Sequence, residues 1–134
     1  MQTALDNPST VPPPAGPYAH VARVDVGGGT LLMLAGQIAV DDSDKVVAPG
    51  DIVSQAEHIF ATIGGILAAH GATFADVLHI RTYLTNLDDL PGYGVVRRRL
   101  FPENPPASTT VEVSRLFRPD ALLEVEVTAA VPAR

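Results

Sequence analysis

The sequence PPASTTVEVSRLFRPDALLEVEVTAA, residues 105–130, contains two runs in which apolar and polar residues alternate. Alternation with a period of two is typical of a β-strand with one buried face, and the Arg-Pro-Asp turn signal between the runs predicts that the two strands are adjacent. The polar faces carry Ser108, Thr110, Glu112 and Ser114 in the first run and Glu124, Glu126 and Thr128 in the second. Because carboxylates on a strand need water, a partner chain or a ligand, we expect the functional site on these strands.

The chain has 134 residues, of which 46% are hydrophobic and 18% are charged, and this composition is typical of a soluble folded protein. Its length predicts one domain, which could make a cleft by oligomerising. The first residues are rich in Pro, Ser, Thr and Asn without periodicity, so we expect residues 1–15 to form a flexible, Pro-rich arm. The single domain is then expected over residues 16–134.

The net charge is −6, which argues against nucleic-acid binding because a protein that binds the phosphate backbone needs a basic face. The basic cluster Arg97, Arg98 and Arg99 falls in a predicted helix and is interpreted as a solvent-exposed helical face. The sequence contains no cysteine, which excludes disulfides, thiol nucleophiles and zinc–thiolate sites.

No segment has the pattern of a signal peptide or of a membrane-spanning helix. The N-terminal residues lack a basic start and an apolar run of signal length. No later stretch reaches roughly 18 uninterrupted apolar residues. We therefore expect a cytoplasmic protein that does not contact a membrane.

Upstream of the opening stretch, the sequence predicts a hairpin, a long helix, a strand and a short helix. The hairpin comprises residues 19–26 and 30–35, on either side of a glycine triplet. The long helix begins after Asp51, a suitable N-cap, and ends at Gly71, a suitable C-terminal stop. The strand and the short helix follow at residues 77–85 and 90–101.

The side chains of the strand at residues 77–85 divide between two faces. Leu78, Ile80 and Leu84 are expected to point toward the helices, and His79, Arg81 and Tyr83 are expected to point away from them. The order β-β-α-β-α-β-β predicts an α+β fold with a mixed sheet and both helices on one face. The other face would carry Arg81, Tyr83, Glu124 and Glu126, and we expect another subunit to close it.

Four short segments carry a resemblance through their order and spacing. They are Gly16-Pro17-Tyr18, Ala35-Gly36-Gln37-Ile38, Val111-Glu112-Val113 with Arg115-Leu116, and Glu124-Val125-Glu126. Together they resemble the RidA/YjgF family, also called the L-PSP endoribonuclease-like family, over residues 15–131. The resemblance implies a chorismate-mutase-like (RidA-like) α+β fold and a homotrimer with clefts between its subunits. It also implies hydrolysis of reactive enamines and imines to 2-keto acids and ammonia, without a metal or an organic cofactor.

The resemblance also implies site residues, position by position. In the family, an arginine that binds the substrate carboxylate stands in a Pro-Ala-Arg-Ser/Thr sequence, and here Ser108 occupies that position and is followed by Thr109. The carboxylate that positions water aligns with Glu126, and the aromatic residue near the cleft aligns with Tyr18. Gly36 belongs to the second of the four segments. We expect these residues to bind a small carboxylate or keto acid, with Glu126 as the catalytic group.

Because serine carries no charge, the sequence leaves open what binds a substrate carboxylate. One hypothesis is that Arg81 substitutes for the missing arginine, and the alternative is that it pairs with a carboxylate at the subunit interface. The function also stays open between an imine or enamine deaminase and a non-catalytic trimer that binds a small molecule or acts as a regulator. A pathway-specific enzyme with different chemistry is a further alternative, whereas the acidic charge disfavours RNA cleavage.

Overall fold

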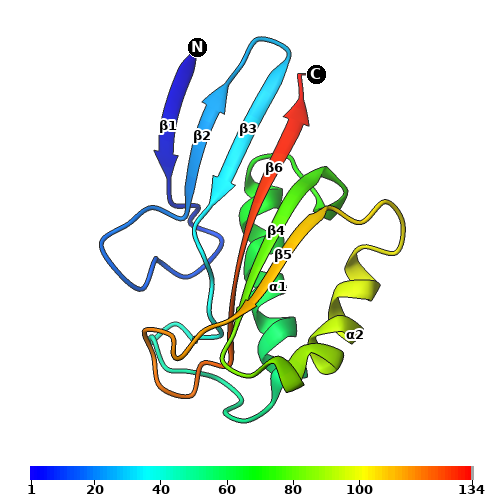
Figure 1. The fold of residues 1–134 in the computed structure, drawn as a ribbon. Helices are drawn as coiled ribbons and strands as arrows, with labels where there is room; N and C mark the ends of the chain where they lie inside the picture. Colours follow the sequence, from blue (N-terminus) through cyan, green and yellow to red (C-terminus); the bar gives the residue numbers. More distant parts are fainter. Residues whose placement is uncertain (134) are drawn as a thin grey trace.

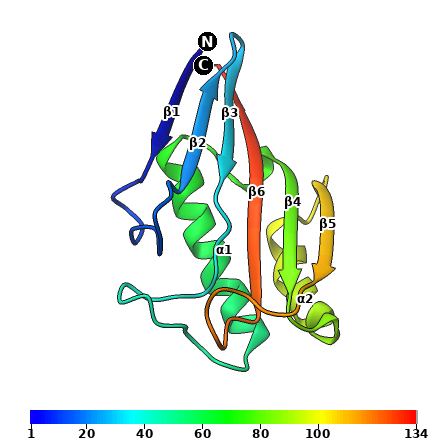
Figure 2. The same ribbon diagram turned by 60° about the vertical axis from the view of Figure 1, so that its left-hand side comes forward.

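The computed structural model describes residues 1–133, and in it two helices pack on one face of a six-stranded mixed sheet (Figure 1, Figure 2). The strands are β1 (Gln2–Asp6), β2 (Val21–Asp25), β3 (Gly29–Leu34), β4 (Val77–Leu84), β5 (Ala107–Glu112) and β6 (Leu123–Pro132). The helices are α1 (Ile52–Ala69) and α2 (Leu90–Leu100), and short 3-10 turns precede β4 and α2 at Phe74–Asp76 and Leu87–Asp89. The strand order is β1-β2-β3-β6-β4-β5. This arrangement confirms the predicted α+β fold with both helices on one face.

β6 is the strand around which the sheet is built. It pairs antiparallel with β3 on one side and with β4 on the other. Its buried positions, at most 1% exposed, are Leu123, Val125, Val127 and Ala129. Full burial of a Val or Leu side chain contributes about 1.5–3 kcal/mol to folding, so this strand's face toward the helices is fixed. Glu124 and Glu126 are consequently held on the face that the helices leave uncovered.

β5 and β6 are not neighbours, so the prediction that the two alternating runs form adjacent strands is wrong. β4 lies between them, parallel to β5 and antiparallel to β6. The physical reason is helix α2, because a strand–helix–strand crossover returns the second strand parallel to the first. Residues 113–122 therefore form a loop at the sheet end rather than a tight hairpin turn.

The N-terminal segment differs from the expected flexible arm because Gln2–Asp6 forms the edge strand β1. It pairs antiparallel with β2 along its whole length. A carboxylate oxygen of Asp6 lies 3.1 Å from Nε2 of His70 at the end of α1. The backbone of residues 8–19 then runs without regular secondary structure to β2.

Local signals for the first hairpin and for α1 are confirmed. Gly27 turns the chain between β2 and β3 at a φ of 66°, which favours glycine because side chains with a Cβ rarely adopt it. The Asp51 side chain caps α1 by accepting hydrogen bonds from the N–H and the hydroxyl of Ser54, at 3.0 and 2.8 Å. At the other end Gly71, at a φ of 72°, ends the helix as the left-handed residue of a C-cap.

Helix α1 has the length and apolar composition of a membrane-spanning helix, but its apolar face packs on the sheet. Its buried residues are Gln55, Ala56, Ile59, Phe60, Ile63, Ile66 and Leu67. A helix that forms one side of a protein core has this same composition. The packing therefore explains the apolar character of α1 as that of a core helix.

β4 departs from the predicted alternation at its start. A register shift between Val77 and His79 turns Val77 into the core and leaves Leu78 54% exposed. The prediction that Leu78 faces the helices is therefore wrong, because a bulge adds one residue and reverses the faces on one side of it. Beyond the bulge the prediction holds, with Ile80 and Leu84 fully buried.

Gln55 is a buried polar residue of α1 that connects two loops to the helix. Its amide nitrogen donates to the carbonyls of Val47, Ala48 and Asp120 at 2.9–3.3 Å. Its amide oxygen accepts from the N–H of Leu122 at 2.9 Å, immediately before β6. Since buried polar groups are costly when unpaired, Gln55 fixes where the loop of residues 113–122 enters β6.

Replacing Gln55 by Met removes the amide and keeps the size of the side chain. We expect the free energy of unfolding to fall by about 2–3 kcal/mol, because the buried N–H and carbonyl groups lose their partner. Chemical denaturation measures the change, with Glu57→Gln on the exposed side of the same helix as the control. A loss of less than about 0.5 kcal/mol, the size of an ordinary surface substitution, would contradict this role of Gln55.

Candidate active site

Three polar side chains form a connected group on the uncovered face of the sheet. Arg81 and Glu126 stand opposite each other in the β4–β6 register, and Arg81 Nε lies 3.7 Å from Glu126 Oε1. The Tyr83 hydroxyl donates to the same oxygen at 2.6 Å, and this hydrogen bond is the main reason that the pKa of Tyr83 is raised. The Glu126 carboxylate therefore already has a hydrogen-bond donor and an ion-pair partner within its own chain. Arg81 likewise has Glu126 as its ion-pair partner.

Glu124 lies two residues earlier on the same face and has a different environment. Among residues 1–133 its side chain forms no hydrogen bond or ion pair. Burial, and then the negative charge of Glu126, raise the pKa of its carboxyl group above the ordinary range. A carboxyl group with a raised pKa keeps its proton to higher pH and is suited to proton transfer. Of the two glutamates, Glu124 is the one left free for chemistry.

Gly36 is the residue against which Glu124 packs. A Cβ atom at Gly36 would lie 2.5 Å from Oε2 of Glu124 and 2.8 Å from its carboxyl carbon. The chain reaches this place because Gln37, just after the end of β3, pairs with Val125 of β6 through two backbone hydrogen bonds of 2.8 and 3.0 Å. The absence of a side chain at Gly36 thus leaves the space that the Glu124 carboxylate fills.

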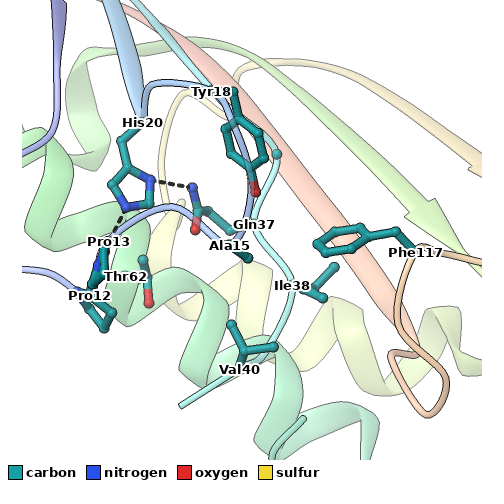
Figure 3. Close-up of a pocket in the computed structure, with 11 residues that line it drawn as sticks. Pro12, Pro13, Ala15, Tyr18, His20, Gln37, Ile38, Val40, Thr62 and Phe117 are labelled. Atoms are coloured by element: carbon teal, nitrogen blue, oxygen red, sulfur yellow. Dashed lines mark hydrogen bonds between the residues drawn. The ribbon is translucent and has the colours of Figure 1, made fainter. Parts of the chain in front are cut away.

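Tyr18 stands beside a small cavity next to this site (Figure 3). Its side chain is 43% exposed, and burial, supported by the charges of Glu124 and Asp44, raises the pKa of its hydroxyl group. The cavity measures about 20 Å³, which is the space of about one water molecule. The cavity is therefore too small to hold an organic ligand.

His20 forms part of the cavity wall and is 3% exposed. Its Nε2 donates to the Pro12 carbonyl at 2.7 Å, and its Nδ1 accepts from the Gln37 amide at 3.1 Å (Figure 3). The carbonyl can only accept, so this pairing requires a proton on Nε2. His20 thus has a structural role in holding the segment of Pro12 against Gln37.

Ser108 and Thr109 lie on opposite faces of the edge strand β5. In the parallel β4–β5 register Ser108 stands beside the buried Ile80, and Thr109 stands beside Arg81. Ser108 therefore faces the helix side, where its hydroxyl accepts a hydrogen bond from Arg97 Nη1 at 2.9 Å. Within one chain Ser108 therefore does not share a face with Glu124 and Glu126, because parallel pairing with β4 sets its direction.

Within one chain the predicted site residues thus fall into two places. Tyr18 and Gly36 lie at the β3–β6 side with Glu124, which was not among the predicted site residues, and Arg81 and Glu126 lie farther along the uncovered face. Ser108 lies at the edge strand, with β6 and β4 between it and β3. Among the described residues no group of three His, Asp or Glu side chains is placed to hold a metal ion.

Two features of this arrangement escaped the sequence analysis. Alternation placed Glu124 and Glu126 on one face, but it carried no signal for which of the two would be paired. Arg97 was interpreted as part of a solvent-exposed helical face, and only the structure brings its guanidinium to Ser108.

Comparison with known proteins gives a family and a fold. The family model described as Endoribonuclease L-PSP matches residues 9–131. A 3-aminoacrylate deaminase RutC of Acinetobacter baylyi is 33% identical, with 92% of this chain and 94% of that protein covered. A 2-iminobutanoate/2-iminopropanoate deaminase of Dermatophagoides farinae is 30% identical, with 86% of each covered.

Solved structures agree with this result. YEO7 of yeast superposes with a TM-score of 0.86 at 26% identity, covering 96% of this chain and 98% of that one. RidA from an Antarctic Psychrobacter superposes with a TM-score of 0.78 at 27% identity, covering 91% and 94% of the two chains.

The raised pKa of Glu124 can be tested by following its side-chain carboxyl carbon in an NMR pH titration. We expect a midpoint above the ordinary range for glutamate, and a lower midpoint in Glu126→Gln, because the variant removes the neighbouring negative charge. Glu112→Gln, on β5 and remote from Glu124, serves as the control and should leave the midpoint unchanged. An unchanged midpoint in Glu126→Gln would show that the two carboxylates do not interact.

Proposed function

The chain belongs to the Endoribonuclease L-PSP family, which is also the RidA/YjgF family, and from this premise we propose that it hydrolyses small reactive imines or enamines to 2-keto acids and ammonia. Two relatives carry names that state deamination of such compounds. The observation on this chain that supports the proposal most is Glu124, a half-buried carboxyl group with a raised pKa and no hydrogen-bond or ion-pair partner among residues 1–133. Imine hydrolysis needs a group that moves protons to and from water and nitrogen.

The proposed reaction assigns one proton-transfer group to the site. Water adds to the carbon of the C=N bond while Glu124 accepts one of its protons and passes it to the nitrogen, which gives a tetrahedral carbinolamine. The Glu124 carboxylate then accepts the proton of the carbinolamine hydroxyl as the C=O bond forms, and it donates this proton to the nitrogen as the C–N bond breaks and ammonia leaves. Imine and water are thus consumed, and keto acid and ammonia are produced, with the carboxylate regenerated. An enamine substrate first takes a proton on carbon to become the imine.

The family resemblance implies that Glu126 is the catalytic group, and we propose a supporting role for it instead. Its oxygen already accepts from Tyr83 and lies near Arg81. Its charge raises the pKa of Glu124. In this proposal Glu126 keeps Glu124 able to hold a proton, and Arg81 balances the charge of Glu126 rather than serving as the substrate anchor.

We also propose that the working site lies between subunits of a homotrimer in the cytoplasm. Both helices cover one sheet face, and the other face is open in the chain (Figure 2). That open face carries exposed apolar side chains, among them Leu5, Met33 and Val111 at 76%, 45% and 40% exposure. A partner subunit would cover these apolar groups and could bring its own β5 edge toward Glu124.

A second function is supported by Ser108. A site that lacks a guanidinium on β5 could bind a small molecule without hydrolysing it, as a non-catalytic or regulatory trimer. The same assay separates the two functions, because only the enzyme would accelerate the release of ammonia and keto acid from 2-iminobutanoate above the uncatalysed rate. Fold alone does not decide between them.

Replacing Glu124 by Gln removes the proposed proton-transfer group and preserves the shape of the side chain. We expect the rate of ammonia release from 2-iminobutanoate to fall about 10²–10⁴-fold, the usual contribution of general acid–base catalysis. Glu126→Gln should cost less, and Glu112→Gln should have wild-type activity. If Glu126→Gln were the inactive variant and Glu124→Gln the active one, the assignment of Glu124 would be wrong.

The stability advantage of the same variant over wild type should grow as the pH rises. The pKa of Glu124 is higher in the folded than in the unfolded chain, so between these two values the unfolded state binds fewer protons and stability falls with increasing pH. A glutamine at this position does not ionise, so the variant does not lose this stability as the pH rises. We therefore expect Glu124→Gln to have a higher melting temperature than wild type at pH 7 and a smaller advantage near pH 4, measured by thermal unfolding. An equal difference at both pH values would exclude this ionisation as the cause.

A further inference from the structure

A cationic hollow lies at the end of α2 in an otherwise acidic chain. It measures about 200 Å³ and is lined by Gly94, Arg97, Arg98, Phe101 and Pro105. Two of these residues are arginines, although the net charge of the chain is −6. The lining also has an aromatic ring and a proline, which provide an apolar wall beside the charges.

Neither arginine of this hollow has an anionic partner among residues 1–133. Their neighbour Arg99 lies 3.7 Å from Glu57, and Arg23, Arg81 and Arg118 each stand near a carboxylate. No ion pair is formed by Arg97 or Arg98. Two unpaired guanidinium groups on successive residues repel each other, and a bound carboxylate would remove that repulsion.

Arg97 is held in place rather than free in solvent. Its Nη1 donates to the hydroxyl of Ser108 at 2.9 Å, and its guanidinium carbon lies 6.0 Å from the centre of the buried Tyr93 ring. A guanidinium that is fixed by a neighbouring strand loses less freedom when it binds an anion. Ser108 thus works as the residue that positions Arg97.

Gly94 makes room for the second arginine. A Cβ atom at Gly94 would lie 3.0 Å from Nη1 of Arg98, which is closer than an ordinary contact. The missing side chain lets Arg98 fold back along the helix toward the hollow. Basic residues in the last turn also interact favourably with the helix dipole, but this effect applies equally to Arg99, which points to Glu57 instead.

From these observations we propose that Arg97 and Arg98, with Ser108 as the positioning residue, bind the carboxylate of the substrate. The ligand class is a small 2-imino or 2-keto acid whose carboxylate meets the guanidinium groups and whose short apolar chain contacts Phe101 and Pro105. This inference rests on the proposed function. In this proposal the substrate carboxylate binds to arginines of α2, and Ser108 of β5 orients one of them.

The direct test is a titration of the isotope-labelled wild-type protein with 2-oxobutanoate, the keto acid that hydrolysis of 2-iminobutanoate yields. We expect the side-chain Nε–H resonances of Arg97 and Arg98 to shift with a common dissociation constant, while that of Arg99 stays in place. This readout uses the intact chain and does not depend on how a variant folds. Equal shifts of all three resonances would show that the anion only screens the positive charges in general. That result would overturn the proposal.

Variants then measure the contribution of each group. Arg97→Met keeps the apolar stem over Tyr93 and should weaken 2-oxobutanoate binding about 10-fold or more, the usual effect of losing a charged hydrogen bond. Arg99→Met is the matched control and should bind as wild type does. In Arg97→Met combined with Ser108→Arg, the new arginine grows from the position whose serine hydroxyl lies 2.9 Å from Nη1 of Arg97, and its guanidinium should restore most of the binding. Wild-type binding by Arg97→Met would overturn the proposal.

Kinetics on 2-iminobutanoate separate this inference from the proposed function. If the chain releases no ammonia but binds 2-oxobutanoate through Arg97, the anchor stands and the deaminase function fails. If the chain is active and Arg97→Met has an unchanged KM, the function stands and the anchor fails. For a true carboxylate anchor we expect KM to rise in Arg97→Met, with a smaller change in kcat.

Discussion

The burial of one face of β6 is the constraint on which the rest of the structure depends. Four apolar side chains of this strand lie against the helices with almost no exposure, and the strand pairs on both sides. Since side chains alternate along a strand, this burial forces Glu124 and Glu126 onto the uncovered face. A register shift of one residue would bury two carboxylates, so the position of the acidic groups is secured by the free energy of the core.

The two glutamates show how one strand gives the same residue type two environments. Tyr83 and Arg81 of β4 stand near Glu126 because the β4–β6 register brings them there. Glu124 instead meets the backbone of Gly36, which offers no charge to balance its own. The unbalanced carboxylate costs folding free energy when ionised, and such a cost is typical of groups that are kept for chemistry rather than for stability.

The other charged region depends on the crossover from β4 through α2 to β5. Parallel pairing places Ser108 on the helix side of the sheet, where it meets Arg97 of the helix that made the crossover. The same connection leaves β4 between this edge and the strand β6 that carries Glu124, and the two residues face opposite sides of the sheet. Joining the two regions into one working site therefore requires a second subunit, and this is the physical reason why the proposed function and the proposed trimer belong together.

Much of the local structure was determined by the sequence itself, because it depends on neighbours along the chain. The alternation of β6, the glycine turn after β2, the cap at Asp51 and the end of α1 at Gly71 were all predictable. Strand order was not, since pairing β5 with β4 instead of β6 is decided by the packing of α2. Likewise, only contacts between distant segments decide that Gln55 joins two loops and that Arg97 reaches Ser108. They also decide that, among residues 1–133, the Glu124 side chain stays unpaired while that of Glu126 does not. Periodicity reports which face a side chain takes, but the partner it meets there is set by the tertiary structure.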